Sequence, residues 1–233
     1  MTTVKRIVCL ANSRKLHGRC IAGRELVDRS PDAWVRPVSS REHQEVSERE
    51  RHYEDGTDPA VLDVIDVPLI AHKPSTYQQE NWLLDPTHYW VKQGRVGWDD
   101  LPRLASPERP LWVDGHSTYH GRNDRIPLVV ADSLTSSLAF IHVDGVELAV
   151  FAPGSAFGDS KRRVQARFSH AGAAYKLWVT DPAYERRFLA QPDAQHHLGE
   201  CFLTVSLGEP YKGDCYKLVA AILEQATPTR GTA

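Results

Sequence analysis

Apolar and polar residues alternate along much of the C-terminal third of the chain, which is the pattern of strands with one buried face. Three such stretches, rich in β-branched and aromatic residues and separated by Gly or Pro, span residues 146–152, 164–169 and 174–180. A short helix is predicted next, because Asp181 is placed to cap it and Pro182 suits its first turn. The predicted order to this point is three strands and a helix.

The chain continues with "CFLTVSL" and "CYKLVAAIL", residues 201–207 and 215–223, on either side of a Gly-Glu-Pro turn. Both are predicted as strands, although the second run could also be a helix that continues through Glu224 and Gln225. Three strands, a helix and two further strands form the order of a five-stranded Greek-key barrel of the OB type. We therefore expect one such barrel in this part of the chain.

The N-terminal part repeats this order. Strand-like stretches occupy residues 6–11, 19–26, 33–38 and 61–72. Ser39, with Glu42 three residues later, has the spacing of a capping box and predicts a polar helix over residues 40–53. The predicted fold class is therefore mainly β with minor α, built as two five-stranded OB-type Greek-key barrels. Their shared order indicates two barrels of one class or an ancient duplication.

The segment between the two barrels has little periodicity and is rich in aromatic residues. It holds four of the six tryptophans, Trp82, Trp90, Trp98 and Trp112. Such a segment is either a packed insert or an aromatic-lined binding surface, and packing is favoured because tryptophan is usually mostly buried. The expected organisation is a first barrel in residues 1–72 that strands of the insert complete, the insert in 73–145, a second barrel in 146–225, and a tail in 226–233.

Composition indicates a folded protein without a membrane segment. With 233 residues, 41% of them hydrophobic, the chain can bury a core. No apolar run approaches the ~20 residues that cross a bilayer, and the first residues lack the features of a secretory signal. A cytoplasmic location with no membrane partner is expected. The four cysteines show no C-x-x-C spacing, which favours reduced thiols.

Charge is unevenly distributed although the formal net charge is only −2. Residues 5–41 hold nine basic and three acidic side chains, whereas residues 42–66 hold nine acidic and two basic ones. Residues 161–187 are basic again, with seven basic and two acidic side chains. Two basic segments separated by an acidic one indicate polarised faces, and ordinary surface charge is the alternative.

Basic and aromatic residues in the two barrels point to nucleic acid as a partner. OB surfaces bind single strands by combining a positive groove with aromatic side chains on which bases stack. Basic residues occur in the predicted first turn of each barrel, at residues 12–19 and 161–163. The candidate nucleic-acid-binding residues are Asn12, Ser13, Arg14, Lys15, Arg19, Arg36, Lys161, Arg162, Arg163, Tyr175, Lys176, Tyr211, Tyr216 and Lys217. Loops that are basic for solubility are the alternative.

The aromatic middle segment also offers a candidate pocket for an extruded or modified base. Aromatic rings would stack on the base, and amide or carboxylate groups would read its edge. The candidate pocket residues are Tyr77, Asn81, Trp82, Trp112, Asn123 and Asp124. Packing of these aromatic side chains in the core is the alternative.

Catalytic motifs are weak by comparison. Asp144 followed by "DSK" at residues 159–161 resembles a metal-dependent nuclease pattern, but so short a pattern often arises by chance. His116 and His120 are four residues apart without a helix to align them, and no phosphate loop, nucleophile elbow or deaminase signature is present. We expect no metal, no cofactor and no catalytic residue, and whether the protein is an enzyme stays open.

Several stretches resemble a known family. They are "KRIVCLANSRKLHGRCIAG", "WVRPVS", "ENWLL", "YKLWVTDP" and, as the most specific, "LTVSLGEPYKGDCYKLVAAIL". Together they are similar to the dual OB-containing domain family, small prokaryotic proteins and domains thought to bind nucleic acid in defence contexts. The resemblance extends over residues 5–223 and implies two OB-type modules that bind nucleic acid.

The functional hypothesis combines both lines of reasoning. It is a nucleic-acid-binding module that recognises single-stranded or modified DNA or RNA, as the sensing or substrate-holding part of a prokaryotic defence or repair system, with a separate effector protein as a further partner. One alternative is a metal-dependent nuclease or another small nucleic-acid-processing enzyme. Another is a protein-interaction adaptor with a small-molecule or nucleotide pocket, to which the acidic segment at residues 40–53 could contribute.

Overall fold

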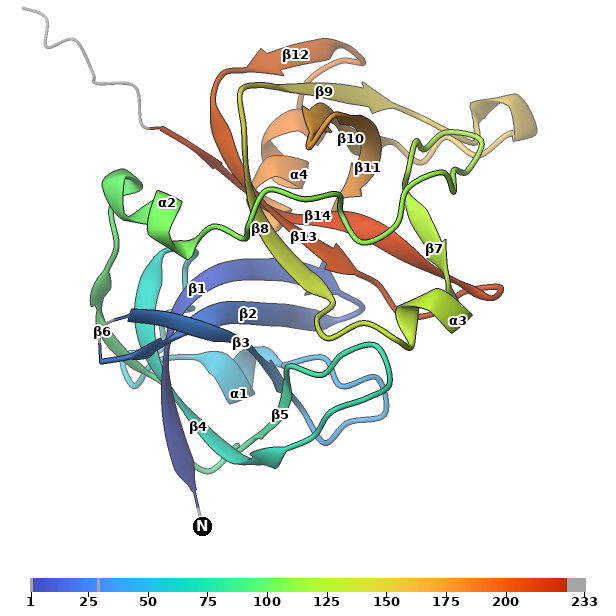
Figure 1. Cartoon of the computed structure of the whole chain (residues 1–233). Helices are drawn as coiled ribbons and strands as arrows, with labels where there is room; N and C mark the ends of the chain where they lie inside the picture. The colour runs from blue at the N-terminus through green and yellow to red at the C-terminus, as the bar shows by residue number, and fades with distance from the viewer. Residues whose placement is uncertain (1, 29, 226–233) are drawn as a thin grey trace, which may run out of the picture.

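The computed structural model describes residues 2–28 and 30–225, and the expected tail at residues 226–233 lies outside the described residues. The described chain is mainly β and forms two sheets that lie against each other (Figure 1). In Figure 1 the blue-to-green first sheet lies below the yellow-to-red second sheet. The predicted mainly β fold class with two sheets is confirmed.

The first sheet has a ring-like order of neighbours. Its strands are β1 (Thr3–Lys15), β2 (Gly18–Val27), β3 (Ser30–Val38), β4 (Asp63–His72), β5 (Asn81–Leu84) and β6 (Val91–Arg95). The pairings run β1–β2–β3–β5–β4–β1, with β3 and β5 parallel, and β6 adds to β4. β1 joins both ends of this series because residues 3–8 pair with β4 and residues 7–15 pair with β2.

The second sheet repeats this connectivity. Its strands are β7 (Arg125–Pro127), β8 (Leu138–Val143), β9 (Val146–Phe151), β10 (Arg163–His170), β11 (Ala173–Val179), β12 (Gln195–Leu198), β13 (Cys201–Leu207) and β14 (Asp214–Glu224). The pairings run β9–β10–β11–β14–β13–β8, with β11 and β14 parallel. Asp144 and Gly145 separate β8 from β9, so these two strands together take the place that β1 has in the first sheet. The run from residue 215 is thus a strand and not a helix.

The helices are short. They are α1 (Glu48–Arg51), η1 (Trp98–Asp100), α2 (Leu101–Leu104), α3 (Leu128–Ala131), η2 (Ser155–Phe157) and α4 (Pro182–Leu189). The helix predicted after Asp181 is confirmed, because the Asp181 side chain accepts hydrogen bonds from the backbone N–H groups of Ala183 and Tyr184. Membrane crossing requires a longer and more apolar helix than any found among the described residues.

The helix predicted over residues 40–53 is wrong in position and length. The observed helix α1 begins after Ser47, whose backbone N–H donates to Glu50, and the Ser39 hydroxyl also donates to Glu50. The preceding residues are held against the sheet, because Val46 is fully buried and its backbone pairs with Arg19. The burial of Val46 therefore overrides the capping-box spacing that starts at Ser39.

The aromatic-rich segment at residues 73–145 contributes to both sheets. It supplies β5 and β6 to the first sheet and β7 and β8 to the second, with η1 and α2 between them. Trp90 is buried in the first sheet, and the Trp98 ring packs against Phe202 of the second sheet, with 5.1 Å between the ring centroids. The predicted domain boundaries stay predictions, since strand pairing alone does not delimit folding units.

Three large hydrophobic cores stabilise this arrangement. The first fills the first sheet around Ile7, Ile65 and Trp90, and the second fills the second sheet around Leu148 and Leu203. A third core lies between the sheets and joins side chains from β1, β2, β3, α2, β8, β13 and β14. The two sheets therefore share buried apolar surface, and they do not pack through polar contacts alone.

The four cysteines are free thiols. Cys9, Cys201 and Cys215 are buried, whereas Cys20 is half-buried. Burial raises the pKa of the Cys9 and Cys201 thiols to about 12 and that of Cys215 to about 11. These three thiols are therefore neutral and shielded at neutral pH.

Candidate nucleic-acid interface

The outer face of the second sheet carries an aromatic and cationic cluster. Inward and outward side chains alternate along β11, and Trp178 is one of its half-exposed outward residues. Phe151 at the end of β9 and Arg163 at the start of β10 are register partners. The Trp178 and Phe151 ring centroids are 5.6 Å apart, and the Arg163 guanidinium lies 4.2 Å from the Trp178 ring centroid. We call Phe151, Arg163 and Trp178 the outer cluster.

The loop before β7 extends the outer cluster. The His120 ring lies 5.8 Å from Phe151, and its Nε2 is 3.0 Å from the carbonyl oxygen of Pro153. The Gln165 side-chain amide donates to the His120 carbonyl oxygen at 2.8 Å, which holds this loop over β10. Tyr119 lies next to His120 and is 95% exposed. A largely exposed ring therefore lies beside His120.

Arg14, near the end of β1, links the two sheets beside the outer cluster. Its backbone N–H donates to the carbonyl of Thr180, which follows β11, at 2.9 Å. Its guanidinium donates twice to Glu185 of α4, at 2.8 and 2.9 Å, and this pairing raises the pKa of Arg14. Burial and the nearby charge of Arg14 lower the pKa of Arg163. Arg14 thus joins the cationic surface of the outer cluster.

Further arginines lie near Arg14 at the junction of the sheets. Arg19 is half-buried on β2, and burial and the charges of Arg51, Arg186 and Arg14 lower its pKa. Asp58 pairs with Arg51 at 2.8 Å and partly offsets this effect. Arg14 and Arg51 are each paired with a carboxylate, Glu185 and Asp58, and the charges of Arg19 and Arg186 add to them. Several arginines therefore lie beside the outer cluster.

Many of the predicted nucleic-acid-binding residues reach solvent. Exposed or half-buried are Asn12, Arg14, Lys15, Arg19, Lys161, Arg162, Arg163, Lys176, Tyr211 and Tyr216. Arg14, Arg19 and Arg163 converge at the junction, whereas Lys15 pairs with Glu209 at 2.7 Å. The structure thus gathers one part of the predicted set and distributes the rest over other surfaces.

Four of the predicted residues are buried and lie outside the outer cluster. They are Ser13, Arg36, Tyr175 and Lys217. Neighbouring residues in a strand point to opposite faces, so Tyr175 and Lys176 cannot both face a ligand, and the same holds for Tyr216 and Lys217. The Lys217 ammonium instead donates to the carbonyl of Val113 at 2.8 Å, and burial lowers its pKa.

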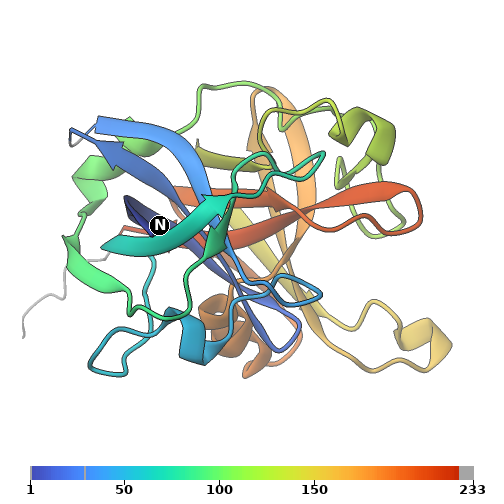
Figure 2. The ribbon, with the colours of Figure 1, turned by 90° about the horizontal axis from the view of Figure 1, so that it is seen from below.

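The two predicted basic turns differ in length. β1 continues through most of the basic residues at 12–19, and only Leu16 and His17 form the turn to β2. The corresponding loop of the second sheet, residues 152–162, contains η2 and projects from the body of the molecule in both views (Figures 1 and 2). Arg162 in this loop donates to two carbonyls at the C-terminal end of α4, so it serves the fold.

The residues predicted to form one base pocket lie in separate places. Tyr77 is buried in a small core beside α3 and β7, and Asn81 is fully buried in β5. Asn123 and Asp124 hold the loop before β7 by accepting hydrogen bonds from its backbone N–H groups. The two tryptophans of the set line two different cavities. The six side chains do not form a common pocket.

Trp82 lies in a groove beside β3 and β5 of the first sheet. The cavity measures about 430 Å³ and is also lined by Trp34 and Arg24. The Lys5 ammonium lies 4.4 Å from the Trp82 ring centroid, and the His72 ring lies 4.9 Å from it. The Arg24 guanidinium lies 5.0 Å from the Trp34 ring centroid. Each sheet thus carries a tryptophan with a cation near its ring.

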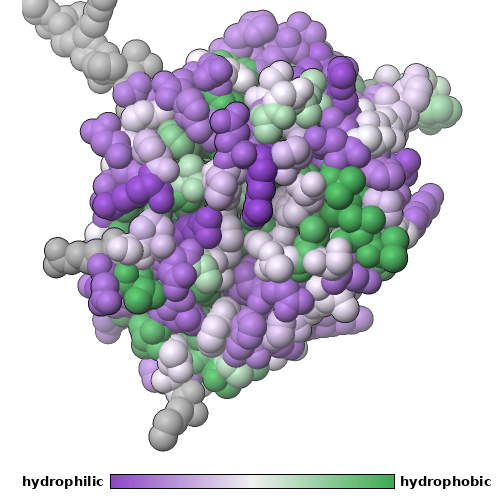
Figure 3. All heavy atoms as spheres, viewed as in Figure 1, coloured by the Kyte–Doolittle hydropathy of each residue, from purple (hydrophilic) through white to green (hydrophobic). Residues whose placement is uncertain are grey.

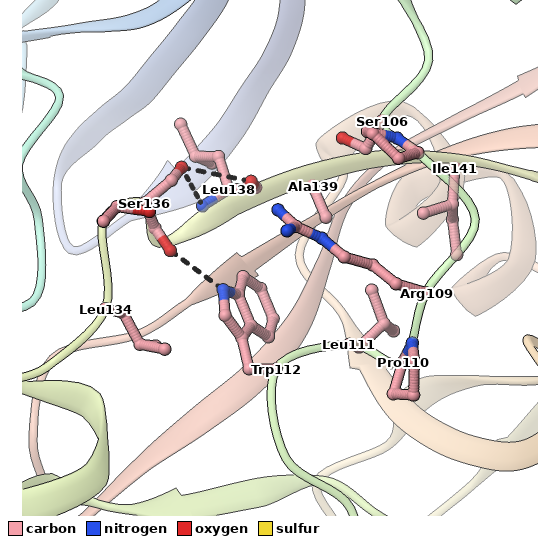
Figure 4. A pocket seen from close by; sticks show the side chains of 12 residues that line it. Ser106, Arg109, Pro110, Leu111, Trp112, Leu134, Ser136, Leu138, Ala139 and Ile141 are labelled. Carbon is pink, nitrogen blue, oxygen red and sulfur yellow. Dashed lines mark hydrogen bonds between the residues drawn. The ribbon is translucent and has the colours of Figure 1, made fainter.

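Trp112 lines a second cavity of about 230 Å³ (Figure 4). Its indole N–H donates to the carbonyl of Ser136 at 2.8 Å, and the Arg109 side chain extends toward the same end of the pocket (Figure 4). Hydrophobic side chains gather on the nearby surface over α3 and β7, where Val129 is 78% exposed (Figure 3). The hydrogen bond to Ser136 therefore holds the Trp112 ring in the wall of the 230 Å³ cavity.

The residues of the nuclease alternative are not brought together. Asp144 precedes β9 and Asp159 follows it in the next loop, so they lie at opposite ends of the strand. The Asp159 carboxylate accepts a hydrogen bond from the Lys161 backbone N–H and shapes its own loop. Within residues 2–28 and 30–225, no three His, Cys, Asp or Glu side chains are grouped to hold a metal ion.

The sequence prediction omitted Phe151, His120 and Trp178. The outward direction of Trp178 follows from its alternation with the apolar Leu177 and Val179, which the sequence does contain. The position of His120 depends on how an irregular loop packs over β10, for which the sequence carries no periodic signal.

Comparison with known families matches residues 5–222 to the dual OB-containing domain family. No curated protein and no solved structure matches the chain. The match spans nearly the whole of both sheets, whose connectivity is also shared, with the parallel pairs β3–β5 and β11–β14 in equivalent places. The chain therefore belongs to the dual OB-containing domain family.

Proposed function

We propose that this protein binds single-stranded nucleic acid on the surface formed by the outer cluster and the arginines at the junction of the two sheets. The observation that carries this proposal is the half-exposed Trp178 ring with Phe151 beside it and the Arg163 guanidinium 4.2 Å from its centroid. Flat rings and cations interleaved on the outer face of an OB-type sheet are what single-strand binding needs.

Each component has a separate role. An unpaired base can stack on an aromatic side chain, which contributes about 1–3 kcal/mol per base. Arg14, Arg19 and Arg163 would bind the phosphates that follow along the strand, and the exposed Tyr119 ring would accept a further base. Bases in a duplex are already stacked and paired, so this surface favours single strands over double strands.

The biological setting is part of the same proposal. Membership of the family supports a sensing or substrate-holding role in a prokaryotic defence or repair system. We place this role in the cytoplasm, with a separate effector protein for any chemistry on the strand. Strands with modified bases fall within the proposal because the same rings would stack on them.

Fluorescence anisotropy with labelled single- and double-stranded DNA and RNA, over a series of salt concentrations, tests the proposal. We expect salt-dependent binding to single strands. Trp178→Ala should weaken it by about five- to 150-fold, the equivalent of one stacked base. The logarithm of the binding constant falls linearly with the logarithm of the salt concentration. Arg163→Ala should make this slope shallower by about 0.7, which corresponds to the loss of one phosphate contact.

Two variants serve as matched controls. Tyr89→Ala removes an aromatic ring that is 55% exposed between β5 and β6, and Arg103→Ala removes an exposed arginine of α2. Both should bind as the wild type does. Absence of binding to every nucleic acid at low salt, or unchanged binding by Trp178→Ala, would reject the proposal. Strand cleavage in the presence of magnesium would favour the nuclease alternative.

A further inference from the structure

A cavity of about 210 Å³ lies between the two sheets. Its wall combines residues of both sheets, among them Ser13, Cys20, Arg36, Thr180 and Ser206. The β1–β2 turn of the first sheet and the β13–β14 hairpin of the second meet here, because Lys15 pairs with Glu209 at 2.7 Å. Leu16, which also lines the cavity, is 56% exposed, so the cavity reaches solvent at this edge.

Arg36 is the unusual member of this wall. Its side chain is 3% exposed, and its Nη2 donates to Ser137 at 2.8 Å and pairs with Glu80 at 3.0 Å. Its Nε and Nη1 atoms are buried and have no hydrogen-bond partner among the described residues. Leaving a buried donor of a charged group without a partner is costly, by about 1–3 kcal/mol or more. A buried guanidinium with unused donors in the wall of a cavity calls for an acceptor-rich ligand.

The wall carries three cationic side chains. Arg14, Lys15 and Arg36 line the cavity together with one carboxylate, Glu209, which pairs with Lys15. Glu80 and Glu185, the partners of Arg36 and Arg14, pair with them from outside this wall. The remaining lining includes hydroxyl and amide groups, which also donate to phosphate oxygens.

We propose that this cavity binds a phosphate monoester, a group that carries nearly two negative charges and three acceptor oxygens at neutral pH. The ester is either a free nucleoside monophosphate or the phosphorylated end of a strand, and the second source rests on the proposed function. The cavity has room for a phosphate with part of its sugar; its cations come from the first sheet, and the second sheet adds the hydroxyls of Thr180 and Ser206. Binding would therefore also hold the two sheets together at this edge.

Cys20 provides a readout in the unmodified protein. It lines the cavity and is half-buried, whereas the other three cysteines are buried. We expect inorganic phosphate and adenosine monophosphate to slow the reaction of Cys20 with a thiol reagent. The rate should fall by about tenfold when the added compound is present at ten times its own Kd. Adenosine, which lacks the phosphate, should not slow it. Equal rates with and without phosphate and the monophosphate, or equal protection by adenosine, would overturn the proposal.

A paired variant tests the role of Arg36 without leaving a charge unpaired. Arg36→Met combined with Glu80→Gln removes both charges of the buried pair. Protection of Cys20 by the monophosphate should be lost in this variant, and full protection would contradict the proposal. If the variant fails to fold, Lys15→Met with Glu209→Gln at the edge of the cavity should weaken protection several-fold, and unchanged protection would contradict it equally.

Two further measurements separate this site from the nucleic-acid interface. Trp178→Ala should weaken strand binding and keep protection of Cys20 by the monophosphate, so either proposal can fail without the other. Oligonucleotides with a 5′-phosphate or a 5′-hydroxyl then distinguish the sources of the ligand. Protection by the phosphorylated strand alone identifies a strand end, and protection by the free monophosphate alone identifies a nucleotide.

Discussion

At the scale of single residues, the buried pair of Arg36 and Glu80 is the most consequential contact. Both side chains are 3% exposed. The hydroxyl and the backbone N–H of Ser137 also donate hydrogen bonds to Glu80. We expect Glu80→Ala to lower the free energy of unfolding by about 3–5 kcal/mol, because it leaves the guanidinium charge buried and unpaired. Denaturant unfolding measures this change, with the exposed Glu108→Ala as its control. A free energy equal to that of the wild type would show that the pair does not stabilise the fold.

Strand alternation explains which candidate residues the sequence could identify. Tyr175 and Lys176 are adjacent in β11, and only Lys176 points outward. Applied strictly, the period of two would have chosen Trp178 in place of Tyr175. No local pattern could have shown that Arg36 is buried, because its partner Glu80 comes from a loop far along the chain. Periodicity thus predicts the direction of a side chain, and tertiary packing decides its partner.

At the scale of elements, the start of α4 is linked to β14 through one carboxylate. Asp181 accepts from the N–H of Ala183 at 2.9 Å as the helix cap, and its other oxygen accepts from the N–H of Ile222 at 3.1 Å. Asp181→Ala should lower the free energy of unfolding by about 2–4 kcal/mol, since it removes the cap and leaves a buried N–H without a partner. Asp181→Asn keeps an acceptor oxygen and should lose less. Equal stability of the alanine variant and the wild type would refute this account.

The same comparison shows why one helix was predicted correctly and the other was not. α4 has a cap, a proline in its first turn and apolar residues at helical spacing, and these local signals agree with its packing. The signal at Ser39 conflicts with the burial of Val46, and the helix forms only after Ser47. The sequence contained both capping-box spacings, and only the packed structure distinguishes them.

At the scale of the whole molecule, hydrophobic alternation predicted the repeated order of strands. It did not predict how the strands of the middle segment pair. The predicted strands of both halves occur, most of them close to their expected bounds, whereas β1 extends through residues predicted to form the first turn. β5, β6, β7 and β8 come from the aperiodic segment, and β8 pairs with β13 from more than fifty residues away. Such long-range pairing depends on which edges remain free after the local hairpins form, so no short window of sequence contains it.

The shared core between the sheets predicts that they unfold together. Phe140 of β8 and Phe202 of β13 are stacked in this core with ring centroids 5.3 Å apart, next to side chains of β1 and β2. Phe140→Ala should cost about 3–5 kcal/mol and still leave one cooperative transition. Pulsed thiol labelling in denaturant checks this, because buried Cys9 reports on the first sheet and buried Cys201 on the second. We expect both thiols to become exposed at the same denaturant concentration, and Phe140→Ala to lower that concentration equally for both. Phe157→Ala, at a position that is 92% exposed, is the control and should leave it unchanged. Separate exposure of the two thiols in the wild type would mean that each sheet is stable without the other.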